Sequence, residues 1–331
     1  MKALVYTGLR KVKFTSVPKP QLKKNEDLIK VHAAGICGSD LHAFNGLDKI
    51  KKKPPIILGH EVSGINLKNN KPVVINPIIT CKKCKNCRSK NENLCTNLAM
   101  IGMSKPIKRQ GGFADFLNIP KKNIFTISNK SKMYEAALTE PTAVALHAVN
   151  LSSLHLKDDI RKANIIIIGG GSIGLLTSII LKNKNVKNIT LLDTNYIRLK
   201  ECRKHSNAFV AHPNSNKLKN NSYNIVFDAV GSIETRRKSL ELISKGGIII
   251  HIGLTQNEGG LDFLQLTRDE ITFIGSYAYS NKEFKKSLSM ILNNQLGDLS
   301  WVDFAPLKDG QIIFNSINQG KTKFPKTILI P

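Results

Sequence analysis

The stretch ANIIIIGGGSIGLLTSIILKN, residues 163–183, joins two apolar runs through a cluster of glycines. The first run is short and rich in isoleucine, which is typical of a buried strand, and the second is long enough for a helix. Further apolar strands, NITLLD at 188–193 and YNIVFDAVG at 223–231, alternate with helical segments. Continuous apolar strands that alternate with helices predict an α/β fold with a doubly wound parallel sheet, covered on both faces.

The glycine cluster fits the G-x-G-x-x-G pattern of dinucleotide-binding turns. The first glycine of that pattern allows a tight turn, the second allows the pyrophosphate to approach, and the third lets the helix pack on the strand. The helix N-terminus also favours phosphate charge. Alone the pattern is weak, but its place between a buried strand and a helix predicts a Rossmann site with cofactor contacts from Gly169, Gly171, Ser172, Ile173 and Gly174.

Asp193 closes the next predicted strand. A carboxylate there can accept hydrogen bonds from the adenosine ribose hydroxyls and repels a 2′-phosphate, which favours NAD over NADP. Arg198 follows five residues later and leaves NADP open, although it could instead stack near the adenine. We therefore predict NAD as the cofactor, with Asp193 and Arg198 at its adenosine end; a purely structural strand-end aspartate is the alternative.

The segment CKKCKNCRSKNENLC, residues 81–95, contains four of the six cysteines. Its C-x2-C-x2-C-x7-C spacing suits tetrahedral zinc, whereas ferredoxin-type clusters that begin alike have a closer fourth cysteine followed by proline. Disulfides are disfavoured in a reducing compartment. Because four thiolates leave no open position on zinc, we predict a structural zinc site at Cys81, Cys84, Cys87 and Cys95.

Length and composition set broader limits. The chain has 331 residues and a net charge of +26, and this length predicts two domains. The lysines are scattered and not interleaved with aromatic residues, which argues against nucleic-acid binding as a main role. The N-terminal residues lack the apolar core of a secretory signal, and the apolar runs are too short to span a membrane. A cytoplasmic protein with reduced thiols and no membrane partner is expected.

The first 150 residues are rich in short β-like runs separated by Gly, Pro and Asn, which predicts a β-rich domain. Residues 139–149 predict a helix with proline in its first turn. Taken singly, Cys37 could be a core residue, and His60 with Glu61 could be an ordinary turn pair. Further possible metal ligands lie in GICGSDLH (35–42), LGHEVSG (58–64) and LTEPTAVALHA (138–148).

The order of GICGSD, GHE, the four cysteines, EP and GGGSIG resembles the zinc-dependent medium-chain alcohol and polyol dehydrogenases over essentially the whole chain. The polyol branch, which includes sorbitol and galactitol-1-phosphate dehydrogenases, is most similar because a glutamate precedes the proline of the EP motif. The resemblance implies a GroES-like catalytic domain at 1–147, a Rossmann NAD-binding domain at 148–275 and a C-terminal return to the catalytic domain at 276–331. After residue 275 we expect short strands and one helix.

The same resemblance implies roles for single residues. Ser39 would take the substrate proton, Asp40 would lie behind the ligand histidine, and His42 would pass the proton to solvent. Whether a glutamate or water completes the metal shell is left open. The implied catalytic zinc ligands are Cys37, His60, Glu61 and Glu140.

The expected activity is that of a zinc-dependent oxidoreductase with a catalytic and a structural zinc. It would oxidise a secondary alcohol or polyol, phosphorylated or not, to a ketone by hydride transfer to NAD. The alternatives are a dehydrogenase of a simple alcohol or L-threonine, and a non-catalytic nucleotide-binding protein. Residues 66–70, NLKNN, are shorter than the hairpin of many family members, which leaves the substrate unassigned. The family also implies a homo-oligomer, either a dimer or a tetramer.

Overall fold

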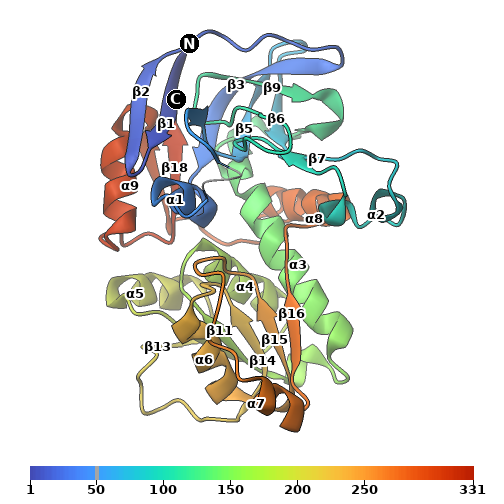
Figure 1. The fold of residues 1–331 in the computed structure, drawn as a ribbon, viewed down its shortest axis with the longest axis vertical. Coiled ribbons are helices and arrows are strands. Elements are labelled where there is room, and N and C mark those ends of the chain that lie inside the picture. Colours follow the sequence, from blue (N-terminus) through green and yellow to red (C-terminus); the bar gives the residue numbers. More distant parts are fainter. Residues whose placement is uncertain (49–51) are drawn as a thin grey trace.

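The structure is a computed structural model that describes residues 1–48 and 52–331. Two lobes are joined by the long helix α3, Thr139–His155 (Figure 1). The N-terminal part of the chain, up to α3, and its C-terminal segment form one lobe, which is rich in strands, and the middle of the chain forms the other. Because α3 runs between the lobes, the predicted boundary at 147/148 falls inside a helix, and the domain limits stay a prediction.

The lobe formed by the middle of the chain contains a six-stranded parallel sheet with the order β13-β12-β11-β14-β15-β16. This is the order of two βαβαβ halves, and the strand order reverses between β11 and β14, where such sheets bind ligands. The strands are β11 Asn164–Ile168, β12 Asn188–Leu192, β13 Phe209–Ala211, β14 Tyr223–Asp228, β15 Ile243–His251 and β16 Thr272–Gly275.

Helices cover both faces of this sheet, which explains the unbroken apolar strands in the sequence. Ile165 and Ile167 of β11 pack in a core with α3, α4 and α5, while Ile166 and Ile168 pack in a second core with α6 and α7. Successive side chains of a strand point to opposite faces, so each face of β11 is buried. The helices are α4 Ser172–Asn183, α5 Tyr196–His205, α6 Ile233–Leu242 and α7 Phe263–Arg268.

The strand-rich lobe is built on a seven-stranded sheet with the order β10-β6-β5-β3-β18-β17, in which β9 also pairs with β3. A three-stranded sheet, β2-β1-β4, and the pair β7-β8 complete it. The elements are β1 Lys2–Gly8, β2 Lys11–Ser16, β3 Glu26–Gly35, α1 Gly38–Phe44, β4 Ile56–Ile57, β5 Glu61–Asn66, β6 Lys71–Ile75, β7 Ile78–Ile79, α2 Lys85–Arg88, β8 Ala99–Met100, β9 Phe116–Pro120 and β10 Ile124–Thr126.

The C-terminal segment returns to this lobe through α8 Asn281–Leu292, β17 Val302–Pro306 and β18 Lys326–Ile330. The expectation of a single helix after residue 275 was wrong, because α9, Gly310–Asn318, is also present. Gly310 begins α9 against Leu4, and Phe314 packs on Phe44 with 5.2 Å between ring centroids. Packing therefore stabilises a helix whose Gly and Asn residues have low helix propensity.

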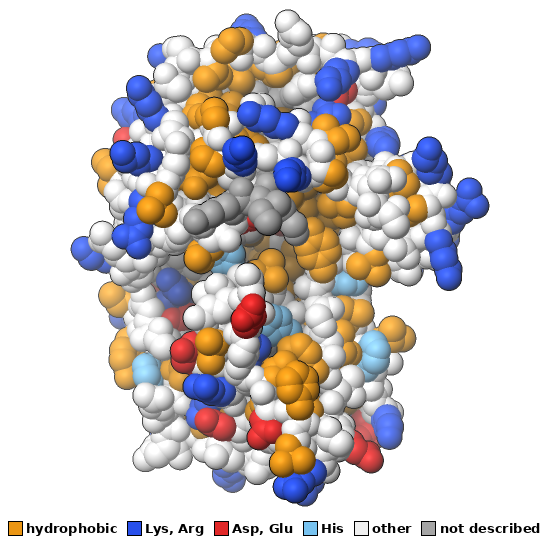
Figure 2. Space-filling model, in the orientation of Figure 1, with side chains coloured by type: hydrophobic (Ala, Val, Ile, Leu, Met, Phe, Trp, Pro, Cys, Tyr) orange, Lys and Arg blue, Asp and Glu red, His pale blue; other side chains and the backbone are white. Residues whose placement is uncertain are grey.

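The surface agrees with a scattered distribution of charge. Lysine and arginine side chains are spread over much of the face in Figure 2. Among the described helices, none combines the length and the apolar character needed to cross a bilayer.

Glu283 ties the connecting helix α3 to α8. Its Oε2 accepts hydrogen bonds of 2.8 Å from both the backbone N–H and the hydroxyl of Ser280, at the start of α8. In α3, His147 Nδ1 lies 3.1 Å from the same carboxylate, and Asn150 donates to it at 2.9 Å. Burial alone would raise the pKa of Glu283, but these contacts, His147 first, lower it to about 2.

The substitution Glu283→Gln is expected to lower the free energy of unfolding by about 2 kcal/mol at pH 7, because it weakens a helix cap and a charged hydrogen bond. The folded-state pKa lies below the ordinary value of 4.5, so this stabilisation should be lost as the pH falls from there toward about 2. Urea unfolding at several pH values measures it. Glu241→Gln, at an exposed ion pair with Lys238, is the control. A difference that stayed constant with pH would contradict the prediction.

Candidate functional site

The GICGSD motif forms the junction between β3 and α1. Asp40 occupies the third position of α1, and its Oδ2 accepts a hydrogen bond of 3.1 Å from the backbone N–H of Cys37. This reciprocal capping fixes the start of a short helix. Cys37 and Ser39 therefore lie at the helix start beside the end of β3, and His42 follows one turn later, half-buried.

The GHE motif depends on a bend at Gly59, which has a φ of +88°. A Cβ atom at Gly59 would also lie 2.6 Å from the ring of Phe113, so glycine is required for conformation and for space. The bend leads into β5, where Glu61 lies opposite Gly35 at the end of β3. The sheet register therefore brings the GHE and GICGSD motifs together.

Cys37, His60 and Glu61 form a potential metal site. One ligand atom from each, a thiol, an imidazole nitrogen and a carboxylate oxygen, lies within 4.8 Å of the others. The Nδ1 atom of His60 is buried without a hydrogen-bond partner among the described residues, and it lies 3.6 Å from Asp40 Oδ1. Sulfur, nitrogen and oxygen ligands in one buried cluster fit zinc.

Glu140 begins α3 next to this cluster but outside the set of mutually close ligand atoms. Burial raises its pKa to about 8, and the charges of Glu61 and Cys37 act in the same direction against that of His60. Burial, with the charges of Glu61 and Asp40, likewise raises the pKa of the Cys37 thiol. These groups would ionise together only beside a cation, as metal ligands do.

Two buried lysines reach this cluster, and the sequence analysis missed both. Lys326 in β18 donates a hydrogen bond of 2.7 Å to the Ile36 carbonyl and forms an ion pair with Glu61. Lys52 lies 2.8 Å from Asp40 Oδ1 and 3.0 Å from Ser39 Oγ. These two lysines are therefore part of the buried cluster, and the scattered distribution of lysines along the chain did not indicate this. For Lys326, its position at the start of the apolar strand KTILI was a signal of burial in the sequence. Lys52 gave no such signal, because it lies within the run KKK at 51–53.

The charges of the cluster suit a divalent cation. When fully ionised, the buried site would contain four anions against the two lysines, and buried charge needs a partner. A doubly charged metal would make the set neutral. The four anionic groups are Cys37, Asp40, Glu61 and Glu140.

The four clustered cysteines form a second potential metal site on the loop between β7 and β8. Their sulfur atoms all lie within 4.8 Å of one another. Backbone N–H groups donate hydrogen bonds to the sulfurs. The N–H of Cys81 donates to Cys95 Sγ at 3.3 Å, and the N–H of Cys84 donates to Cys81 Sγ at 3.4 Å. Such hydrogen bonds, from Cys87 first, lower the pKa of Cys84 to about 6. Four convergent sulfurs suit a closed tetrahedral zinc site.

The cysteine loop also contacts the segment that precedes α8. Asn93 donates a hydrogen bond of 2.8 Å to the Tyr277 carbonyl, and Glu92 accepts one of 2.9 Å from Asn281. This segment carries Tyr279, which is buried. Burial, and then the charge of Glu140, holds the pKa of Tyr279 well above its usual range. The loop thus supports a tyrosine close to the first cluster, a contact that motif reasoning did not find.

The glycine turn has the geometry of a phosphate-binding turn. Gly169 has a φ of +104°, and a Cβ atom at Gly174 would lie 1.8 Å from the Gly169 carbonyl oxygen. At Gly171, the N-cap of α4, an added Cβ would meet nothing within 4 Å. The turn is therefore tight where helix and strand pack and open at the helix N-terminus, where Ser172 and Ile173 begin α4.

Asp193 follows β12 and anchors the neighbouring loop. Its Oδ2 accepts a hydrogen bond of 2.7 Å from the Gly170 N–H, and its Oδ1 accepts one of 2.7 Å from the Asn195 N–H. Arg198 Nη1 lies 3.3 Å from the same carboxylate. Arg198 is therefore paired with Asp193 through its Nη1 atom.

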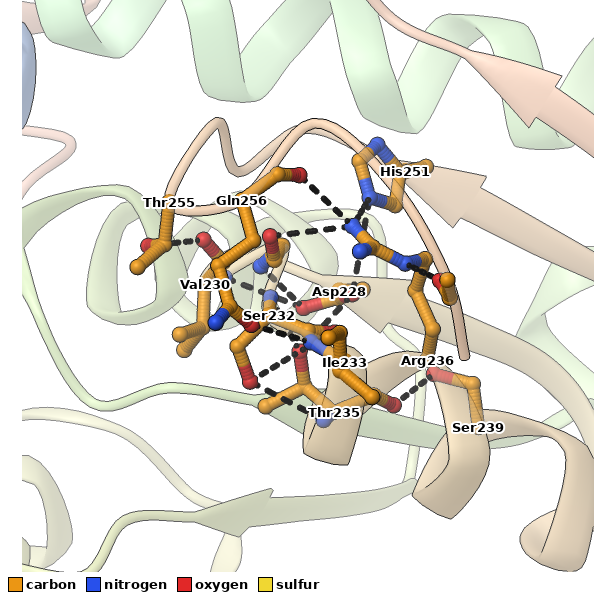
Figure 3. Close-up of polar contacts among 12 residues, drawn as sticks. Asp228, Val230, Ser232, Ile233, Thr235, Arg236, Ser239, His251, Thr255 and Gln256 are labelled. Atoms are coloured by element: carbon orange, nitrogen blue, oxygen red, sulfur yellow. Dashed lines mark hydrogen bonds and ion pairs between the residues drawn. The ribbon is translucent and has the colours of Figure 1, made fainter. Parts of the chain in front are cut away.

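A polar network, also missed from the sequence, lies at the end of β14 and the start of α6, beside the glycine turn (Figure 3). Asp228, at the end of β14, accepts hydrogen bonds from the N–H groups of Val230 and Gly231, at 3.0 and 2.8 Å. The buried Arg236 of α6 donates to the carbonyls of Gly231 and Gln256, at 3.1 and 3.0 Å. The network fixes the position of Val230. A Cβ atom added at Gly169 would lie 2.6 Å from the Val230 side chain, so the glycine turn packs directly against this network.

Comparisons with known proteins match both the strand-rich lobe and the lobe with the parallel sheet. Residues 23–129 match the alcohol dehydrogenase GroES-like domain, and residues 172–293 match the zinc-binding dehydrogenase domain. Together the two matches cover more than half of the chain. The predicted fold class, a GroES-like domain with a Rossmann domain, is confirmed.

Relatives span nearly the same length. A probable D-xylulose reductase A from Neosartorya fischeri is 25% identical, covering 96% of this chain and 94% of its own. Sorbitol dehydrogenase from Bacillus subtilis is 28% identical, with 85% and 83% covered. The solved acetophenone reductase from Geotrichum candidum, in complex with NAD, has a TM-score of 0.88 at 23% identity and covers 100% and 97%. The chain is an oxidoreductase that belongs to the zinc-dependent medium-chain alcohol and polyol dehydrogenases.

Proposed function

We propose that the protein oxidises a secondary alcohol group of a polyol, phosphorylated or not, to a ketone, with NAD as the hydride acceptor. The convergence of Cys37, His60 and Glu61 beside the Ser39 hydroxyl carries this proposal. Such a site combines metal ligands with a group that can accept a proton. The names of the sorbitol and xylulose relatives support the polyol class.

In the proposed mechanism the residues of the chain handle the proton. A zinc held by Cys37, His60 and either Glu61 or Glu140 would supply Lewis acidity that lowers the pKa of the alcohol. Ser39 Oγ accepts the hydroxyl proton of the substrate as it gives up its own. The substrate carbon loses a hydride, and the carbon–oxygen bond becomes a carbonyl.

His42 and Asp40 support this path. Burial, and then the charge of Lys52, lowers the pKa of His42, so this residue is neutral at pH 7 and can accept a proton. Although burial would raise the pKa of Asp40, the charges of Lys52 and His60 hold it below its usual value. The Asp40 carboxylate therefore stays charged beside His60 and favours one orientation of the ring.

We propose NAD because Asp193 lies where the adenosine ribose would bind and because Arg198 is engaged by Asp193. We also propose a structural zinc in the four-cysteine loop and a cytoplasmic location. All six cysteines are free, which suits a reducing compartment.

We further propose that the chain assembles as a homo-oligomer, a dimer or a tetramer. The strand β16 lies at the edge of the parallel sheet, where unpaired backbone groups can receive another strand. The segment before it exposes Leu254, Phe263 and Leu264, whose exposed fractions are 60, 74 and 57%. Exposed apolar residues beside a free sheet edge favour association.

Replacing Phe263 and Leu264 with serine is expected to shift the protein toward monomer. The apolar area that both side chains would bury in the oligomer, and the free energy it contributes to association, would be lost. Light scattering after size exclusion measures the mass. The same substitutions at Leu154 and Ile312, which are exposed elsewhere, are the control. A wild-type monomer at micromolar concentration would contradict the proposal.

We expect about two zinc ions per chain, measured by elemental analysis of the purified protein. Cys37→Ser should remove one zinc and the activity while leaving the melting temperature nearly unchanged. Cys95→Ser should remove the other zinc and lower the melting temperature, because the cysteine loop supports the segment around Tyr279. Loss of both ions from Cys37→Ser alone would show that the two sites are not independent.

The experiment that tests the activity is a screen of polyols, polyol phosphates, simple alcohols and L-threonine with NAD⁺ and NADP⁺. We expect a polyol or its phosphate with NAD⁺ to give the highest kcat/KM. A higher kcat/KM for a simple alcohol or for L-threonine would show that the proposed polyol class is wrong. Inactivity of the zinc-loaded protein on the whole panel would reject the proposed function.

In the same screen, Asp193→Ala should raise the KM for NAD⁺ roughly thirtyfold. This corresponds to a loss of about 2 kcal/mol of binding free energy, because the contacts of the Asp193 carboxylate are removed.

A further inference from the structure

Lys52 is buried beside the serine that we propose as proton acceptor. Its side chain has 0% exposure, and its Nζ donates hydrogen bonds to Ser39 Oγ at 3.0 Å and to Asp40 Oδ1 at 2.8 Å. The next residue, Lys53, is exposed. One lysine of the basic run is therefore directed into the site, and its neighbour is directed away from it.

Burying an ammonium group is costly, so its position needs a reason. The Asp40 carboxylate compensates the charge, but neutralising Asp40 does not require a second contact with Ser39. An ammonium group has donors and no acceptor, so Ser39 Oγ must accept from Lys52. A hydroxyl has two lone pairs and one proton. Lys52 occupies one lone pair and leaves the other for the substrate proton.

We propose that Lys52 is a positioning residue of the proton path, an inference that rests on the proposed function. Lys52 orients the Ser39 hydroxyl so that its free lone pair receives the substrate proton and its own proton departs to the next acceptor. The O–H bond of the substrate breaks as a new O–H bond forms on Ser39, and the former serine proton leaves at the same time. Lys52 keeps its three protons, and its charge stabilises the electron density that builds up on Ser39 Oγ.

Steady-state kinetics of the zinc-loaded enzyme, with the best substrate of the screen, test this role. Lys52→Met should lower kcat roughly tenfold to a hundredfold, which is at or below the usual contribution of general acid–base catalysis, and should change the KM for the alcohol less than about threefold. Its solvent deuterium isotope effect on kcat should rise, because proton transfer becomes slower. Lys52→Arg should restore most of kcat, and Lys53→Met is the matched control with no expected change.

A double-mutant cycle with Ser39→Ala separates positioning from a general structural effect. If Lys52 acts through Ser39, Lys52→Met should change kcat less than about twofold in the Ser39→Ala background. Equal losses in both backgrounds, or an unchanged kcat in the single variant, would overturn the inference and leave the proposed function intact. Inactivity of the wild-type enzyme on the whole screen would overturn both. Lys52→Gln, which keeps a hydrogen-bonding group for Asp40, replaces Lys52→Met if the methionine variant does not fold.

Discussion

The compensation of buried charge is the constraint on which the candidate site depends. Asp40 and Glu61 are almost completely buried, and a carboxylate in such a place is tolerated only with a cationic partner. Lys52 and Lys326 supply these partners, and the metal expected from the family would complete the balance. Each ion pair also joins separate elements, so charge compensation and the assembly of the site are the same event.

The sheet register determines which residues can meet in this way. The strand β3 lies between β5 and β18, so the residue that ends β3, Gly35, has Glu61 on one side and Ile328 on the other. The absence of a side chain at Gly35 is needed, since a Cβ there would lie 1.9 Å from Glu61 Oε2 and 2.9 Å from Lys326 Cε. Residues far apart in the chain therefore form a compact site at one end of β3.

Local features of the sequence predicted much of the fold. A helix was expected after residue 275, where α8 is present, and the glycine turn lies between strand and helix as predicted. Strand limits were harder to predict: among the short β-like runs of the first 150 residues, KPVVINPII at 71–79 is divided into β6 and β7, because Pro77 cannot donate to the ladder. The motifs also named the residues that cluster in the site. Lys52 and Lys326 could not be predicted, because nothing in a lysine-rich sequence marks which lysines become buried through contacts of long range.

The position of β18 has a consequence for the order in which the protein is made. Chains emerge from the ribosome N-terminus first, and domains fold as units. The parallel sheet in the lobe formed by the middle of the chain, ending with β16, is complete before β18 has been synthesised. The strand-rich lobe starts earlier but waits for β18, and Glu61 remains without its lysine until then. The nascent chain should therefore acquire the ability to bind a dinucleotide before it acquires a finished catalytic centre.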